Sequence, residues 1–297
     1  MRLSRIFFLF CLFAAMVLGS TASFADKGSK GSKGSHSNAR HHKHRGHHKH
    51  RRYRNKNRRY QRYVRRACRD LPSHAELTEA LCQATTGTGD CSAAPAHGGF
   101  SLNMWGTVVN RDGVVCAVTF TGDHRGDQWP GSRVISAQKA NTANAFSLPG
   151  LALSTASLWE ATRDQGSLAD LTESNPVDTK VAYRGPSKRY GQSNDPMVGR
   201  KIGGVNDFGG GLALYDADGK LIGAVGVSGD TSCEDHSIAW NTRANLALAN
   251  VPLGPTTAFG LAGAVLGDEL VFIDAANTAG FGHAHCFNDA AGSGTLF

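Results

Sequence analysis

The sequence lacks the short motifs by which several classes of enzyme and metal protein are recognised. It has no Cys-x-x-Cys, no Cys-x-x-Cys-His and no paired zinc-ligand spacing, which argues against a thioredoxin-like centre, covalently attached haem and a zinc ribbon. It also has no Walker A loop, no Gly-x-Gly-x-x-Gly after a strand, no His-Glu-x-x-His and no EF-hand loop. The segment GVSG at 226–229 is one residue too short for a serine nucleophile elbow. The sequence motifs therefore give no support for any of these reactions or sites.

Long apolar runs are also scarce. One covers residues 6–18, and no other run approaches the roughly 20 apolar residues of a membrane span. Arg2 and Arg5 precede this run, and the small-x-small sequence ending at Ala25 follows it. This order predicts a signal peptide over residues 1–25, so we expect a secreted or periplasmic protein.

Acidic residues are almost absent from residues 26–66, where 16 Lys and Arg accompany one Asp. Residues 67–297 are instead acidic, with 14 Lys and Arg against 23 Asp and Glu. The basic segment contains almost nothing apolar to bury, so we predict a disordered His/Lys/Arg-rich arm. Its partner is predicted to be an anionic envelope surface. Metal binding by the repeated His-His-x-His units is an alternative, and nucleic acid is unlikely because an exported protein seldom meets it.

Six cysteines remain beyond the predicted signal peptide, and they are Cys68, Cys82, Cys91, Cys116, Cys233 and Cys286. An even number in an exported chain indicates up to three disulfides. We predict that Cys233 pairs with Cys286, because the C-terminal tail needs an anchor. Metal binding by the cluster His283-x-His285-Cys286 is the alternative to this disulfide. The pairing of the other four cysteines stays open.

Two stretches alternate with the period of two that is typical of strands, and each contains an Asp-Gly turn. They cover residues 107–120 and 212–227, with turns at 110–113 and 216–219. We predict two antiparallel hairpins in one sheet, each followed by a helix.

Capping patterns and apolar spacing predict the helices. Ser73 with Glu76, and Thr231 with Glu234, have the spacing of a capping box. The predicted helices cover 73–83, 132–146, 151–163 and 233–249, with a long loop over 164–205 and a short strand over 270–273.

Glycines gather where the second hairpin begins and ends. Gly226 shares one strand face with Ala224, and residues 209–211 are all glycine. Missing side chains permit the close approach of a backbone, a helix or a flat ligand. The stretch is therefore either a tightly packed hairpin or the floor of a pocket.

The sequence GGGLAL at 209–214, then DGKLIGAVGVSG at 218–229, resembles the C-terminal half of the GlcG/HbpS-like haem-binding domain family. The segment 132–146 resembles that family's Lys-Ala-x-Thr-Ala helix. The resemblance covers about residues 70–250. It implies an α+β fold with a profilin-like antiparallel sheet of about five strands flanked by helices. We therefore predict a domain over 67–250 and a C-terminal extension over 251–297 that packs on it.

The resemblance further implies binding of haem or a similar planar tetrapyrrole, and assembly into dimers or larger oligomers. His236 would be the metal ligand and Lys139 a partner of the propionates, although a histidine at this position is more commonly part of a core. The other candidate ligand-binding residues are Gly209, Gly210, Gly211, Gly226, Ser228, Gly229 and Thr231. The alternatives are a small-molecule enzyme or binder for organic acids, and a non-catalytic envelope-associated interaction protein.

Overall fold

A computed structural model of the chain describes residues 55–254, 267–274 and 278–287. The chain divides into two compact units, Met1–Arg52 and Tyr53–Phe297, and every described residue belongs to the second. The predicted signal peptide and residues 26–54 of the predicted arm lie outside the described residues. Within the described part, no helix is both long and apolar enough to cross a membrane.

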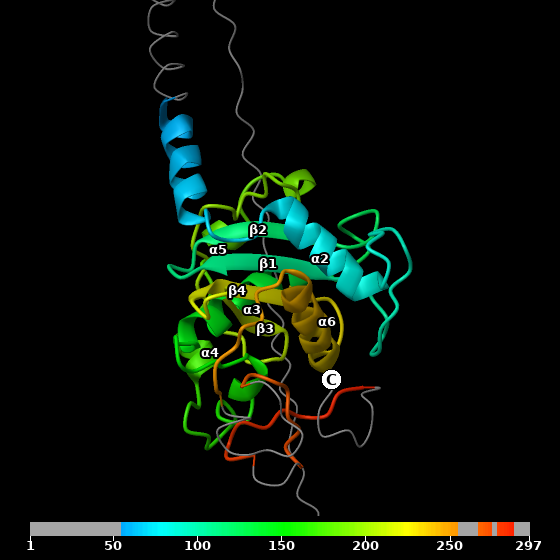
Figure 1. Cartoon of the computed structure of the whole chain (residues 1–297), viewed down its shortest axis with the longest axis vertical. Coiled ribbons are helices and arrows are strands. Elements are labelled where there is room, and N and C mark those ends of the chain that lie inside the picture. The colour runs from blue at the N-terminus through cyan, green and yellow to red at the C-terminus, as the bar shows by residue number, and fades with distance from the viewer. Residues whose placement is uncertain (1–54, 255–266, 275–277, 288–297) are drawn as a thin grey trace, which may run out of the picture. The chain divides into compact units, whose positions relative to one another are not determined.

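Four antiparallel strands form one sheet in the order β2-β1-β4-β3 (Figure 1). The strands are β1 (Trp105–Asn110), β2 (Val115–Phe120), β3 (Gly211–Tyr215) and β4 (Leu221–Ser228). Both predicted hairpins are confirmed, and β1 joins them by pairing with β4, so that Val108 lies opposite Val225. The α+β prediction is also confirmed, with four strands in place of about five.

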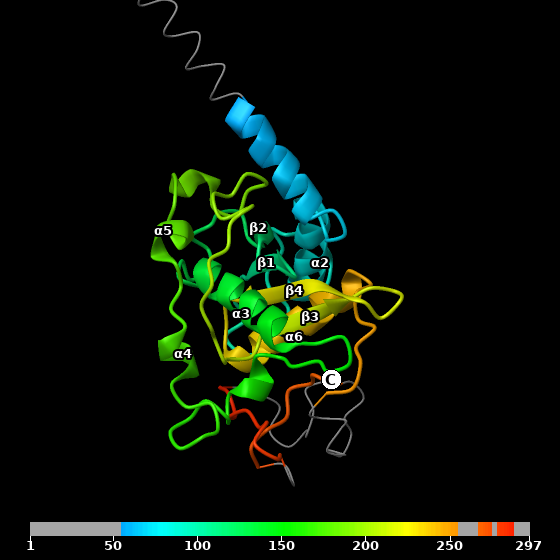
Figure 2. The same cartoon turned by 90° about the vertical axis from the view of Figure 1, so that its left-hand side faces the viewer.

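Helices cover both faces of the sheet (Figure 2). Helices α2 (His74–Thr86) and α6 (Ser232–Asn245) pack on one face, where Leu77, Leu81 and Ile238 join the buried strand residues. Helix α3 (Ser132–Phe146) covers the other face with alanines. Small side chains on α3 and glycines on the strands below it let this helix approach the sheet closely.

The predicted helix starts are confirmed by their caps. The Ser73 hydroxyl accepts from the Glu76 N–H while the Glu76 carboxylate accepts from the Ser73 N–H, a complete capping box. The Thr231 hydroxyl likewise accepts from the Glu234 N–H at the start of α6. Helix α6 ends before the predicted residue 249, because Ala247 has a left-handed φ of 55° and the Leu248 carbonyl pairs with β3 at Tyr215.

The predicted helix over 151–163 is wrong. The chain makes a single 3₁₀ turn, η1 (Ala156–Leu158), because flanking backbone groups bond to distant segments. The N–H of Ala152 donates to Leu253, and that of Thr155 donates to Gly211. The predicted strand at 270–273 is reduced to one bridge between Phe272 and His283. Tertiary hydrogen bonds override local propensity in both places.

The long segment 164–205 is an irregular cover containing α4 (Leu171–Ser174), α5 (Thr179–Ala182) and the 3₁₀ turn η2 (Ser187–Arg189). A buried ion pair holds it to α3. The Arg133 guanidinium donates to both carboxylate oxygens of Asp195, at 2.9 and 2.5 Å, and to the Ala182 carbonyl. The same guanidinium lies 3.7 Å from the centre of the Tyr190 ring.

Residues 55–67 form a helix, so the prediction of disorder through Arg66 does not hold for residues 55–66. The helix has partners that its composition did not reveal. The Tyr60 hydroxyl donates to the Val198 carbonyl at 2.5 Å, and Tyr60 and Val64 both lie against Gly199. The disulfide Cys68–Cys116 then ties the end of this helix to β2.

Three disulfides link the six cysteines that follow the predicted signal peptide. Cys68–Cys116 and Cys82–Cys91 lie within the N-terminal half of the domain. The third bond, Cys233–Cys286, forms as predicted and joins the first turn of α6 to the C-terminal segment. Cys286 is therefore a half-cystine rather than a free metal ligand.

Candidate functional site

The glycines of the second hairpin lie under other parts of the backbone rather than beside an opening. A Cβ on Gly226 would collide with the carbonyl oxygen of Ser136 and would lie 2.5 Å from the backbone nitrogen of Ala140. A Cβ on Gly211 would lie 2.5 Å from the carbonyl oxygen of Lys139. Helix α3 thus rests directly on β3 and β4, in the space that the missing side chains leave.

The remaining predicted floor glycines are closed in the same way. A Cβ on Gly209 would meet the carbonyl of Ser232 in α6, and one on Gly229 would meet the carbonyl of Asn103. Gly210 has a φ of 116°, which L side chains rarely adopt, and faces the Val227 carbonyl. The prediction that these glycines form an open floor for a planar ring is therefore wrong, because two helices and a loop fill that space.

Lys139 is buried within this packing and forms an internal ion pair. Its Nζ donates to Asp235 Oδ2 at 2.6 Å, and both side chains are almost fully buried. Asp235 Oδ1 accepts from the backbone N–H groups of Gly229 and Asp230, each at 2.9 Å. Burial raises the pKa of Asp235, and Lys139 opposes that shift. The ammonium group is thus already engaged by a carboxylate of the same chain.

His236 occupies the core, as the commoner interpretation of its position indicated. It is fully buried, and its ring centre lies 6.2 Å from that of Trp240, one helical turn away. Burial lowers the pKa of His236 well below its usual value, and Arg243, His283 and Lys139 lower it further. The imidazole is therefore neutral, and its side chain is shielded from solvent.

Ser228 and Thr231 have local structural roles. Ser228 ends β4 opposite Trp105 and is buried. Thr231 is the N-cap of α6, and its hydroxyl already accepts a backbone hydrogen bond. Both residues lie near Asp235, but neither presents its side chain to a described cavity.

The C-terminal segment adds a buried histidine that sequence reasoning did not place in this region. His283 Nδ1 lies 2.7 Å from the Ala284 carbonyl, and the Gly209 N–H donates to His283 Nε2 at 3.4 Å. Burial lowers the pKa of His283 to about 4. The spacing of residues 283–286 marked a cluster, but no sequence signal placed it against Gly209.

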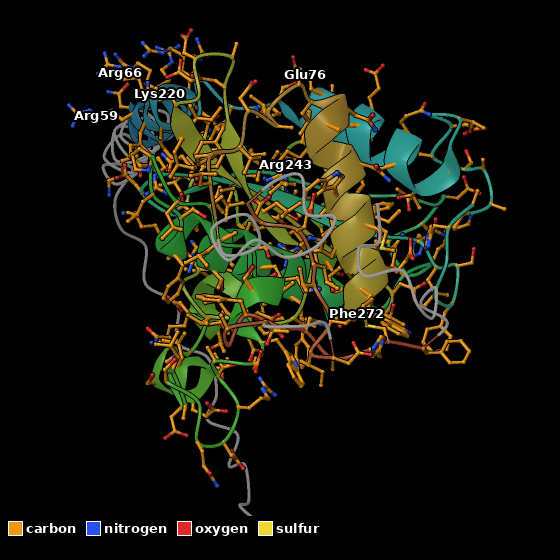
Figure 3. The ribbon with its side chains drawn as sticks, turned by 60° about the horizontal axis from the view of Figure 1, so that its bottom comes forward. Arg59, Arg66, Glu76, Lys220, Arg243 and Phe272 are labelled. Atoms are coloured by element: carbon orange, nitrogen blue, oxygen red, sulfur yellow. A yellow bond between two sulfur atoms is a disulfide. The ribbon has the colours of Figure 1, made fainter. Side chains whose placement is uncertain are left out.

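Further contacts hold this tail segment against both ends of α6. The Arg243 guanidinium pairs with both oxygens of the buried Asp268, at 2.6 and 3.0 Å. Phe272 lies beside the beginning of α6 (Figure 3), in an apolar cluster with Ala156 and Cys233. We call Lys139, Asp235, His236 and His283 the buried cluster. It joins α3, α6 and the tail around the glycines, and within it Lys139 and Asp235 form an internal ion pair.

Three described cavities lie elsewhere. The largest of the three, of about 940 Å³, runs along α2, from the residues before it to Thr88 and Gly89 after it, beside the end of α6. Another, of about 570 Å³, lies between residues 158–168 and 279–281. The third, of about 640 Å³, is lined by Arg59, Arg62, Tyr63, Arg66, Ala67 and Asp112. None of the three is lined by the buried cluster.

The fold is thus an antiparallel sheet between α3 on one face and α2 with α6 on the other. Residues 101–243 match the family described as "Haem degrading protein HbpS-like". This match lies within the part of the chain where the sequence resembles that family, and it confirms the resemblance. A search of curated proteins found no significant match.

Three solved structures are partly similar to this chain. The crystal structure of a PduOC:heme complex is 20% identical, covers 58% of this chain and 89% of its own, and has a TM-score of 0.38. The Klebsiella pneumoniae protein ORFY is 19% identical, with coverages of 59% and 90% and a TM-score of 0.39. HbpS is 18% identical, with coverages of 58% and 88% and a TM-score of 0.31.

Proposed function

We propose that this protein is an exported haem-binding protein. The observation that carries the proposal is the family match over residues 101–243, because that family is described by its action on haem. A protein similar to this chain, PduOC, has been solved as a haem complex. The apolar run at residues 6–18, with its basic start and small-residue end, supports export.

The residues first predicted to hold haem do not fit a ring in the arrangement described. Backbone atoms occupy the space above Gly226 and Gly229, and Lys139 is engaged by Asp235. His236 has the neutral imidazole that suits iron, but it is fully buried. The proposal therefore concerns haem as the ligand and does not place it on the glycine floor.

A haem titration of the mature, oxidised chain tests this function. We expect saturable growth of a Soret band, and its absence would overturn the proposal. The His236→Ala variant tests whether His236 binds the haem iron, and His285→Ala, at an exposed histidine, is its matched control. Loss of the band only in the folded His236→Ala protein would support His236 as the iron ligand, as the sequence predicted. An unchanged band in both variants would assign the haem to another site.

A second function is favoured by the helix 55–67, which exposes several arginines. We propose that residues 26–66 attach the protein to an anionic envelope surface. Clustered Lys and Arg are attracted to anionic surfaces by about 1 kcal/mol each. A peptide of residues 26–66 should bind vesicles that contain anionic lipid, and binding should weaken as salt rises. Equal binding to neutral vesicles would contradict this function.

A further inference from the structure

One side of the helix 55–67 forms a pocket with the turn between β1 and β2. Arg59, Arg62, Tyr63 and Arg66 follow the spacing i, i+3, i+4 and i+7, so they share one helix face. Together with Ala67 and Asp112 they line the cavity of about 640 Å³. The arginines lie at the outer edge of the molecule, where Figure 3 labels Arg59 and Arg66.

The pocket belongs to a helix that is fixed to the folded domain. The Tyr60 hydroxyl is bonded to the Val198 carbonyl, and the Arg200 guanidinium lies 5.5 Å from the centre of the Tyr60 ring. The disulfide Cys68–Cys116 follows directly after the helix. A ligand at this pocket would therefore not have to order the arginine-bearing backbone, which lowers the entropic cost of binding.

The three arginines are free to bind an anion. Among the described residues, no ion pair includes Arg59, Arg62 or Arg66. Within the same described part of the chain, the one side-chain hydrogen bond from this set runs from Arg62 Nε to the Arg58 carbonyl at 3.4 Å. Asp112 is the single acidic residue of the lining, so the pocket is net positive.

The side chains indicate a phosphate rather than a generic anion. The helix carries five arginines and only one lysine, and the planar guanidinium donates two parallel hydrogen bonds to a phosphate. Tyr63 is 47% exposed among the arginines, and aromatic rings with a polar end favour the headgroup level of a membrane.

We propose that this pocket binds the phosphate of anionic lipid headgroups. The inference rests on the proposed surface attachment and locates it on Arg59, Arg62 and Arg66. The rigid helix is the specific contact in this arrangement, and the preceding basic residues contribute long-range attraction. Asp112 opposes a purely anionic headgroup by charge repulsion.

Vesicle sedimentation with the full mature chain tests the pocket. The probes are vesicles of phosphatidylglycerol with phosphatidylcholine, compared with phosphatidylcholine alone. Loss of any two basic residues near an anionic surface should weaken binding by up to roughly thirtyfold, about fivefold for each. Arg59→Gln with Arg62→Gln should exceed that loss, because both residues also contact the phosphate in the pocket. Arg58→Gln with Arg65→Gln removes the same charge from the same helix but outside the pocket, and should not exceed it. Asp112→Asn should strengthen binding severalfold.

The possible outcomes distinguish the proposed pocket from the proposed surface attachment by residues 26–66. Equal losses in the two double variants would overturn the pocket and leave the attachment standing. Absence of binding by the unaltered chain would overturn both. Tighter binding to a single-stranded oligonucleotide than to the vesicles would overturn the lipid assignment. Complete displacement by micromolar glycerol phosphate would assign the pocket to a soluble phosphate instead.

Discussion

The interior of the domain and the helix 55–67 use charged residues in opposite ways. Inside, Lys139, Arg133 and Arg243 each meet a buried aspartate, and none of these carboxylates faces solvent. On the helix, Arg59, Arg62 and Arg66 are exposed and have no acidic partner among the described residues. The interior charges fix segments that are distant in sequence, whereas the outer charges are available to a partner. A charged residue near a suspected site is therefore informative only once its partner is known.

The largest expected effect comes from leaving one interior charge without its partner. Asp235→Ala strands the Lys139 ammonium in the core and should lower the free energy of unfolding by about 3–5 kcal/mol. Urea denaturation measures this value. Lys139→Met combined with Asp235→Leu should cost less than Asp235→Ala alone, because no unpaired charge remains. A loss below about 1 kcal/mol for Asp235→Ala would contradict the burial of this pair.

Acidification should weaken the interior through His283, whose pKa is lowered to about 4 by burial. The unfolded chain, with a pKa near 6.5, binds this proton more readily than the folded chain, so stability falls as pH drops from about 6.5 to about 4. The effect should amount to roughly 2–3 kcal/mol. Denaturation at pH 7 and pH 4.5 should show a smaller loss in His283→Asn than in the unaltered protein. The exposed His285→Asn serves as the control, and identical pH slopes in both variants would refute the assignment.

Filling a buried glycine should have the next largest effect. Gly226→Ala places a methyl group against the backbone of Ser136 and Ala140, and overpacking of this kind costs about 1–3 kcal/mol. Thermal unfolding measures the change. Gly131→Ala is the matched control, since nothing lies within 4 Å of its added Cβ and its φ of −65° suits alanine. If Gly226→Ala were as stable as the control, the space above β4 would be open after all.

The smallest expected effect is on the outer helix. Arg59→Gln with Arg62→Gln should leave the free energy of unfolding within about 0.5 kcal/mol of the unaltered value, because both residues are exposed and unpaired. The same urea titration compares this variant directly with Asp235→Ala. A destabilisation above about 1 kcal/mol would mean that these arginines support the fold, and the contrast between the two regions would disappear.

The sequence was sufficient for features set by nearby residues. The hairpin turns, the Ser73 cap and the Thr231 cap were all predicted, since each depends on residues within a few positions. The glycines indicated that a backbone, a helix or a flat ligand approaches β4 closely, and the prediction of a flat ligand was wrong. Their partner was not predictable, because a helix and a flat ligand require the same absence of side chains.

Features set by distant contacts were missed. Asp235 lies 96 residues after Lys139, and nothing in the local pattern joins them. The helix predicted over 151–163 failed because Thr155 bonds to Gly211, and the disorder predicted through Arg66 failed because Tyr60 reaches Val198. In each case contacts with residues distant in the sequence decided the local structure.

The bond between Cys233 and Cys286 determines how the protein has to be handled. It is the covalent fastening between α6 and the tail, and Cys286 Sγ lies only 3.1 Å from the backbone nitrogen of Cys233. In a buffer containing a strong thiol, the tail would be retained only by contacts such as the Arg243–Asp268 pair. Ligand assays on reduced material would therefore examine a different covalent form from the disulfide-bonded protein.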